Sequence, residues 1–115
     1  MTDTDTCLFC QIVAGEIPAD IVRATEHTVA LRDIEPVAPT HVLVVPRAHH
    51  DDIAQLSASD SGLAGRLMAD AGAAAAELGL EEFRLVLNTG ATAGQSVFHV
   101  HAHILGGRPM QWPPG

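Results

Sequence analysis

Three histidines alternate with apolar residues near the end of the 115-residue chain, at positions 99, 101 and 103. In a β-strand, residues at i, i+2 and i+4 line one face, so an extended segment over residues 96–105 would place the imidazoles of His99, His101 and His103 in one row, about 7 Å apart. The intervening side chains would face the other way, into apolar packing: Phe98, Val100, Ala102 and Ile104. Neutral imidazole is both a nucleophile near pH 7 and a common metal ligand. The row therefore predicts catalysis or metal binding with equal weight, and favours either over a purely structural role.

A loop of small and polar residues precedes the histidines. Its amide, hydroxyl and glycine positions are Asn88, Gly90, Gly94, Gln95 and Ser96. Glycines let the backbone approach a ligand closely, and polar side chains donate hydrogen bonds, so this order suits a cradle for a small anion. It is not a Walker phosphate loop, because that motif needs a lysine and the chain contains none.

The composition excludes several classes of function. All six basic residues are arginine, against 14 acidic residues, and the formal net charge is −8. Without lysine there is no Schiff-base catalysis and no Ser–Lys dyad. The acidic balance argues against a nucleic-acid surface, which needs a basic stripe, and no apolar run approaches the roughly 18 residues of a membrane span. With no export signal and only two cysteines, we expect a cytoplasmic protein of one domain.

Cys7 and Cys10 have the spacing C-x-x-C. Three interpretations stand: a redox pair, two inert buried thiols on a short helix, or half of a four-ligand zinc site that two histidines complete. The redox pair is the least favoured of the three, because such a pair follows a strand and no strand is predicted before Cys7.

The first half of the chain predicts a helix and two strands. A short helix over residues 7–13 carries apolar residues near a 3.6 period and ends around Gly15. Two β-rich segments follow at residues 28–33 and 41–45, and two prolines between them exclude both helix and central strand. The second segment presents alternate residues to two faces: His41, Leu43 and Val45 to one, and Val42 and Val44 to the other.

One long helix dominates the second half. Ser57 and Asp60 resemble a capping box at its start, apolar residues recur at helical spacing after it, and Gly79 supplies a left-handed stop. Residues 83–88 alternate as a strand, and residues 96–105 are again extended. The order helix, strands, helix, strands favours an α+β fold with a mainly antiparallel sheet.

The segment from His99 to Leu105 matches the histidine triad pattern, His-φ-His-φ-His-φ-φ with φ apolar. Six further segments match the same family: Leu8-Phe9, Glu16-Ile17-Pro18, Asp33-Ile34, Pro39-Thr40-His41, Gly94-Gln95-Ser96 and Leu105-Gly106-Gly107-Arg108. From Cys7 onward the chain therefore resembles the histidine triad (HIT) family. Its ending, Trp112-Pro113-Pro114-Gly115, is similar to that of the histidine triad nucleotide-binding proteins, which are purine nucleoside phosphoramidases. Uridylyltransferase relatives carry glutamine where this chain has His103.

The resemblance implies an α+β, HIT-like fold. It comprises a mainly antiparallel five-stranded sheet, one long helix and a short N-terminal helix, in a homodimer. We expect residues 1–6 to be disordered and residues 7–115 to form a single HIT domain, with a C-terminal tail at residues 106–115. In the homodimer this tail would bring Trp112 near the partner's active site; a disordered tail is the alternative.

The resemblance also implies a reaction. The protein would hydrolyse the P–N bond of purine nucleoside 5′-phosphoramidates and release the nucleoside monophosphate. His101 would be the nucleophile that forms a covalent nucleotidyl-histidine, His103 would contact the phosphate and His41 would orient it. His99 would support the triad from a second layer. The phosphate oxygens and the leaving group would be held by Asn88, Gly94, Gln95 and Ser96.

By the same resemblance Asp33 binds the ribose, and Phe9, Ile12 and Ile34 line the nucleoside pocket. Taken alone, Asp33 could equally be a turn residue, and Phe9 and Ile12 could be plain core. Relatives often place an aromatic residue and a histidine beside the base, where this chain has leucine and arginine at positions 31 and 32.

Two alternative functions remain open. One is a nucleotide-binding regulatory protein with little turnover, and the other is a dinucleoside polyphosphate hydrolase of the same family, which the tail disfavours. For the cysteine pair, the resemblance implies a structural zinc held by Cys7, Cys10, His49 and His99. His50 is the alternative ligand in place of His49. Catalysis would require no cofactor.

Overall fold

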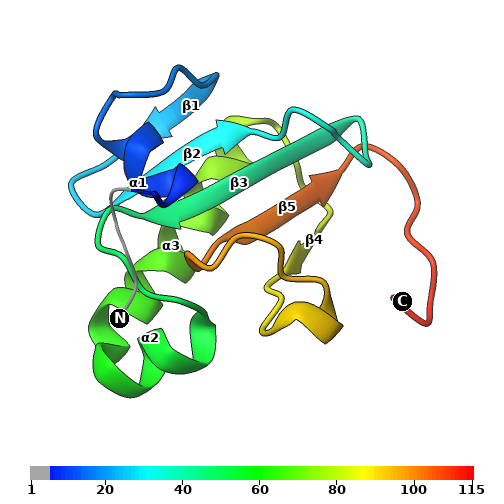
Figure 1. Ribbon diagram of the computed structural model, residues 1–115. Helices are drawn as coiled ribbons and strands as arrows, with labels where there is room; N and C mark the ends of the chain where they lie inside the picture. Colours follow the sequence, from blue (N-terminus) through cyan, green and yellow to red (C-terminus); the bar gives the residue numbers. More distant parts are fainter. Residues whose placement is uncertain (1–5) are drawn as a thin grey trace.

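The computed structural model describes residues 6–115 as a curved antiparallel sheet with helices on both faces (Figure 1). The five strands lie in the order β1-β2-β3-β5-β4 and every neighbouring pair is antiparallel. Their bounds are β1 Ile21–Ala24, β2 Thr28–Arg32, β3 Thr40–Pro46, β4 Phe83–Val86 and β5 Ala102–Gly106. The helices are α1 Leu8–Val13, α2 Ile53–Ser59 and α3 Ser61–Glu77, with a 3-10 turn at Ala91–Ala93. The α+β class and the five-stranded antiparallel sheet are confirmed.

The two faces of the sheet carry separate apolar clusters. Val42 and Val44 of β3 face α3, whereas Leu43 and Val45 face α1, so the predicted alternation is confirmed. The alanines of α3 allow this long helix to pack closely on the sheet, and Ala71, Ala74 and Ala75 are almost fully buried. On the opposite face the six-residue helix α1 covers only part of the sheet (Figure 1). The rest of that face is left available for a cavity.

The start of the long helix differs from the prediction. Asp60, rather than Ser57, is the N-cap of α3, and its carboxylate accepts from the Leu63 N–H at 3.0 Å. Ser57 lies inside α2, a helix that the sequence analysis missed and that Asp52 caps. Aspartate is as good an N-cap as serine, so the polar run contains two helix starts and only the second was recognised. The stop at Gly79 is confirmed by its φ of +77°.

The predicted extended segment over residues 96–105 is too long. Strand β5 begins at Ala102, and residues 97–99 form a bend. The Val100 N–H donates to the His50 carbonyl at 2.7 Å, which ties this stretch to the loop after β3 instead of to the sheet. Of the three alternating histidines, His103 alone lies in the strand. Phe98, predicted to be buried, is 48% exposed, whereas Val100, Ala102 and Ile104 are buried as expected.

The ends of the chain bear on two further predictions. The segment predicted to be disordered, residues 1–6, lies outside the described residues except for Thr6. The tail after β5 extends away from the sheet (Figure 1), and its Trp112 is 81% exposed. Within residues 6–115, no helix has the length and apolar character needed to cross a membrane.

Candidate active site and metal cluster

A cavity of about 510 Å³ opens on the sheet face that α1 only partly covers. Apolar side chains from α1, β2 and β3 form one part of its wall: Phe9, Ile12, Leu31 and Leu43. The polar groups gather at the other part: Asp33, His41, Ser96, His101 and His103. The structure therefore brings together most of the predicted catalytic and nucleoside-binding residues around one opening.

His101 is held in one tautomer by the backbone. Its Nδ1 lies 2.8 Å from the carbonyl oxygen of His99, and a carbonyl can only accept, so Nδ1 donates and Nε2 keeps its lone pair. The side chain is 8% exposed, and its ring lies 5.0 Å from that of Phe9. Burial lowers the pKa of His101, which keeps the ring neutral near pH 7. A neutral imidazole with its free nitrogen on a cavity is a nucleophile ready to react.

His103 has the opposite tautomer, and a chain of hydrogen bonds sets it. The Val37 N–H donates to His41 Nδ1 at 3.1 Å, so a neutral His41 carries its proton on Nε2. That nitrogen lies 2.9 Å from His103 Nδ1, which must accept, and the His103 proton is therefore on Nε2. Burial, with the two neighbouring imidazoles, lowers the pKa of His103 to about 4, so the ring is neutral at physiological pH. The cavity thus contains one nucleophilic nitrogen and one N–H donor.

The carboxylate of Asp33 supports the same chain. Its Oδ2 lies 3.4 Å from His41 Nε2, and its Oδ1 accepts from the Glu35 N–H at 2.8 Å. Asp33 therefore stabilises the turn after β2, as its interpretation as a turn residue predicts, and it also faces the histidines. Its predicted contact with a ribose stays a prediction. The three groups lie close enough to suggest a metal site. However, the Val37 N–H keeps a proton on His41 Nε2, which argues against ligation there.

The loop before the histidines divides into residues on the cavity and residues behind it. Ser96 lines the cavity, whereas Asn88, Gly94 and Gln95 do not. Gln95 is 3% exposed and its amide is used within the protein. Its Oε1 accepts from the Gly90 N–H at 2.8 Å, and its Nε2 donates to the carbonyls of Asp51 and Val97 at 2.6 and 3.1 Å. In this structure Gln95 braces the loop that presents Ser96.

The remaining predicted pocket residues lie at different depths. Phe9 and Ile12 are both core and cavity wall, at 3% and 7% exposure. Ile34 lies at the rim and is 95% exposed. Trp112 does not line the cavity, and its ring lies 5.9 Å from the Arg84 guanidinium. The structure therefore does not bring Trp112 to the cavity of its own chain.

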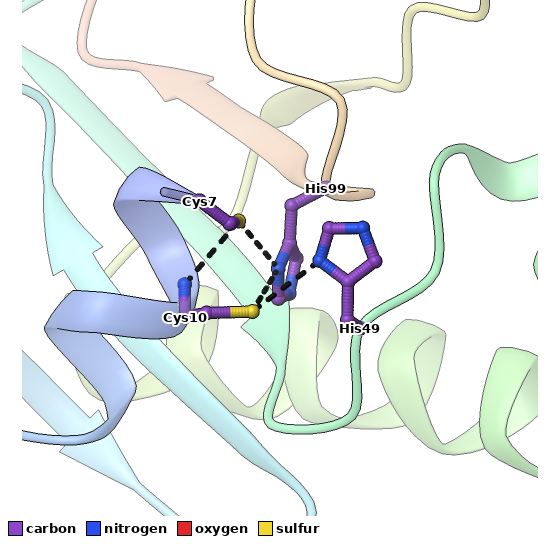
Figure 2. Close-up of side chains that lie close together, drawn as sticks. All are labelled: Cys7, Cys10, His49 and His99. Carbon is purple, nitrogen blue, oxygen red and sulfur yellow. Dashed lines mark hydrogen bonds between the residues drawn. The ribbon is translucent and has the colours of Figure 1, made fainter. Parts of the chain in front are cut away.

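A second cluster lies behind the cavity, where α1 meets two loops (Figure 2). Cys7 Sγ is 3.3 Å from His99 Nδ1, and Cys10 Sγ is 3.3 Å from His49 Nδ1 and 3.5 Å from His99 Nδ1. All four ligand atoms lie within 4.8 Å of one another. In a tetrahedral zinc site, bonds of about 2.3 Å to sulfur and about 2.0 Å to nitrogen separate these ligands by roughly 3.5 Å. The four residues therefore fit a zinc ion with little movement.

The outer nitrogens of both imidazoles also suit a metal site. His99 Nε2 donates to the Pro46 carbonyl at 2.8 Å, and His49 Nε2 lies 3.2 Å from the Asp51 carboxylate. Histidines that ligate zinc almost always have such a partner, because it fixes the tautomer and turns the other nitrogen toward the metal. His50 pairs with Gln55 at 2.9 Å instead and is not part of the cluster. Sequence reasoning missed the Pro46 and Asp51 contacts, for which the sequence carries no signal.

The cysteines are two free thiols. Burial and the neighbouring Cys7 raise the pKa of Cys10 to about 11, so two thiolates here would be unfavourable without a compensating cation. A metal reverses this balance because it binds the thiolate form. The donor set therefore suits a cation that would hold both sulfurs as thiolates.

His99 belongs to this cluster and not to a row of three imidazoles on one strand face. The prediction of a single row is wrong because the bend at residues 97–99 turns the His99 ring toward the cysteines. Its backbone carbonyl nevertheless holds His101, as described above. His99 therefore connects the two sites, through its ring on one side and its carbonyl on the other.

Comparisons with known proteins point to one family. A model of the HIT domain matches residues 14–110. The chain belongs to the HIT family. An uncharacterized HIT-like protein of Synechocystis is 46% identical over 109 residues, 94% of this chain and 96% of the relative. A 14 kDa zinc-binding protein of Zea mays is 40% identical over 117 residues, 98% of this chain and 91% of that protein.

A solved structure of a HIT family hydrolase from Legionella pneumophila superposes on this HIT protein with a TM-score of 0.91. The two share 46% sequence identity, over 96% of this chain and 100% of the Legionella chain. The predicted family and its fold are confirmed. A zinc-binding relative and the Cys/His cluster are together consistent with a structural zinc in this HIT protein.

Proposed function

We propose that this HIT protein is a nucleotide hydrolase of the phosphoramidase branch, which cleaves the P–N bond of purine nucleoside 5′-phosphoramidates. The observation that carries the proposal is the pair of opposite tautomers on one cavity. His101 presents a lone pair at Nε2, and His103 presents an N–H at Nε2. Attack on phosphorus needs a nucleophile, and the negative oxygens around that phosphorus need a donor beside it.

The reaction has two balanced steps. In the first, His101 Nε2 attacks the α-phosphorus, a P–N bond to His101 forms and the P–N bond to the amine breaks. The leaving amine takes up one proton, which reaches it from solvent by way of the Ser96 hydroxyl at the cavity wall. In the second step water attacks the phosphorus, the bond to His101 breaks, and the water gives up one proton to solvent. The products are the amine and the nucleoside monophosphate, and His101 is restored.

His103 stabilises the charge that develops on the phosphate oxygens. Because its Nδ1 accepts from His41, its Nε2–H is fixed as the donor, and no reorientation is needed as the charge grows. One preorganised donor of this kind lowers a barrier by roughly 3 kcal/mol. Asp33 would accept from the ribose hydroxyls, and Phe9 and Ile12 would pack against the base. The rim residue Ile34 would cover the bound nucleoside.

Hydrolysis of a panel of adenosine and guanosine phosphoramidates tests the proposal. The wild type should release the amine from the adenosine and from the guanosine substrates. His101→Ala should lose at least about 10³-fold in kcat while binding the nucleoside monophosphate normally. Activity retained within about tenfold, or 1.4 kcal/mol of barrier, would show that His101 is not the nucleophile. Tight nucleotide binding without turnover by the wild type would instead indicate a regulatory nucleotide-binding protein. Preference for dinucleoside polyphosphates would indicate the other hydrolase branch.

We further propose that Cys7, Cys10, His49 and His99 hold a structural zinc. Bound there, zinc would supply no chemistry to the reaction and would fasten α1 to the loops before α2 and β5. The two residues of α1 that line the cavity, Phe9 and Ile12, would then be fixed relative to His101.

The homodimer and the cytoplasmic location expected from the resemblance and the composition remain proposals. The edge strand β4 supports the first, because Phe83 on this strand is 41% exposed and Trp112 lies beside Arg84 of the same strand. Light scattering at micromolar concentration checks it, and a monomer would count against the assigned branch.

A further inference from the structure

The chain after β5 folds back tightly against the loop between β2 and β3. Gly107 has a φ of +91°, and a Cβ built there would lie 2.9 Å from the Cβ of Pro39. A glycine is therefore needed at this position for both its backbone conformation and its lack of a side chain. This close approach carries the next residue, Arg108, across the outside of the β2–β3 loop.

Arg108 donates two hydrogen bonds to one carbonyl of that loop. Its Nη2 and Nε donate to the Val37 oxygen at 3.0 and 3.3 Å, and its Nη1 donates to the Pro109 oxygen at 3.1 Å. The Val37 side chain is 62% exposed and does not anchor the loop by burial. The guanidinium therefore supplies an anchor that apolar packing does not.

Val37, whose carbonyl accepts from Arg108, is also the residue whose N–H sets the His41 tautomer. The Val37 N–H donates to His41 Nδ1 at 3.1 Å, and its C=O, on the other side of the same Cα, accepts from Arg108. Fixing the carbonyl restricts the Val37 backbone and so keeps its N–H directed at the imidazole. A continuous set of hydrogen bonds leads from Arg108 through Val37 and His41 to His103.

We propose that Arg108 is a positioning residue for the His41–His103 pair: by holding Val37, it keeps the proton of His41 on Nε2 and the proton of His103 on the nitrogen that faces the cavity. The inference rests on the proposed function for its kinetic consequence alone. The tautomers are a property of the folded protein whether or not it hydrolyses phosphoramidates.

Losing the Val37 N–H would change which nitrogens of His41 and His103 carry a proton. The Asp33 carboxylate, 3.4 Å from His41 Nε2, also favours a proton on that nitrogen. Without the Val37 N–H, however, a neutral His41 can place its proton on Nδ1 in a fraction of the molecules, and its Nε2 is then an acceptor. His103 must in that case donate from Nδ1, and its Nε2 presents a lone pair to the cavity. A lone pair beside phosphate oxygens repels them where an N–H would attract them. One change of tautomer in the loop contact thus reverses the polarity at the predicted phosphate site.

An arginine suits this position better than another cation. The planar guanidinium places two N–H groups on one oxygen, whereas an ammonium group donates from a single flexible point. A matched control is an arginine of β4 that contacts the same C-terminal segment: Arg84 Nη2 donates to the Gln111 carbonyl at 2.9 Å. Arg84→Gln removes a hydrogen bond between a guanidinium and a carbonyl of the C-terminal segment, and it leaves the contact between Arg108 and Val37 in place.

The direct test is NMR of protein with ¹⁵N-labelled histidine, in which two-bond ¹H–¹⁵N correlations identify the protonated nitrogen of each neutral ring. In the wild type and in Arg84→Gln, His41 and His103 should both show an unprotonated Nδ1 and a protonated Nε2. In Arg108→Gln, the fraction of both rings in this tautomer should fall, because the Asp33 carboxylate alone then favours it, while backbone spectra remain those of the folded protein. Arg108→Lys should give an intermediate pattern, and it provides the test if Arg108→Gln does not fold. A wild-type pattern in a folded Arg108 variant would overturn the proposal.

Single-turnover kinetics supply the second readout. Arg108→Gln should slow formation of the nucleotidyl adduct by about tenfold or more, since misplacing one preorganised donor has a cost of this order or larger. The dissociation constant of the nucleoside monophosphate should change less than the rate. An unchanged adduct rate in an active Arg108→Gln enzyme would contradict the kinetic part. If the wild type forms no adduct, the proposed function fails, whereas the NMR comparison still decides the role of Arg108.

Discussion

Replacing Gln95 by alanine distinguishes a residue that braces the loop from one that binds phosphate. The substitution removes the acceptor for the Gly90 N–H and the donor for the Asp51 and Val97 carbonyls. Each hydrogen bond contributes about 1 kcal/mol net, and a buried partner left unsatisfied adds to the loss, so we expect unfolding to become easier by about 2–3 kcal/mol. For a domain of this size, about 4 °C of melting temperature per kcal/mol corresponds to a drop of about 10 °C.

Gln55→Ala is the matched control for this substitution. Gln55 also uses its amide twice, toward Ser59 at 3.1 Å and His50 at 2.9 Å, but it lies on an exposed face of α2. Water replaces these contacts in the variant, so the expected change is within about 0.5 kcal/mol. Thermal unfolding followed by circular dichroism measures both variants.

The two interpretations of Gln95 give opposite results. If Gln95 braces the loop, Gln95→Ala lowers the melting temperature well beyond the control, with or without nucleotide. If Gln95 is instead a phosphate ligand, as the resemblance implied, the melting temperature of the free protein stays near that of the wild type and nucleotide affinity falls. A melting temperature within about 2 °C of the control would refute the bracing role.

Three further predictions concern the metal cluster, the histidines and the tail. Purified protein should contain about one zinc per chain by metal analysis; His49→Ala should lose it, and His50→Ala, outside the cluster, should retain it. Burial and the neighbouring imidazoles hold the pKa of His103 near 4, against 6.5 for an ordinary histidine. The unfolded chain therefore binds more protons between these values, so the free energy of unfolding should decrease as pH falls from 6.5 to 4, and less so in His103→Gln. Gly107→Ala should destabilise the fold by more than about 1 kcal/mol in denaturant titrations, whereas Gly72→Ala, in open space on α3, should stabilise it by about 0.5 kcal/mol.

The sheet faces and the long helix were predictable because their signals are local. The alternation in β3 and the helical spacing of residues 63–78 depend on one element each, and both are confirmed. The start of α3 was misplaced because Ser57, Asp52 and Asp60 are all good N-caps, and the choice among them depends on where the chain must turn. Strand β1 was not predicted as a separate element; only four residues form it, and the residues after it show no apolar alternation that would extend the pattern.

The site residues were identified mainly through the histidine pattern and the family resemblance. The directions in which their side chains point were not predicted. Alternation alone predicted one row of rings, whereas a backbone bend that no side-chain pattern reveals sends His99 to the cysteines. The contacts that fix the tautomers come from backbone groups of Val37, Pro46 and His99 itself. Every residue carries such groups, so the sequence gives no sign of which ones are used.

Capture of the covalent intermediate tests the central claim most directly. The protein is mixed in excess with an adenosine phosphoramidate, the reaction is stopped in alkali, where a phosphorus–histidine bond survives, and the digested peptides are analysed by mass spectrometry. We expect adenylate attached to His101, at a level that rises and falls within one turnover, and no adduct in His101→Ala. Release of the amine at the full rate without an adduct, or with adenylate on any other residue, would contradict it.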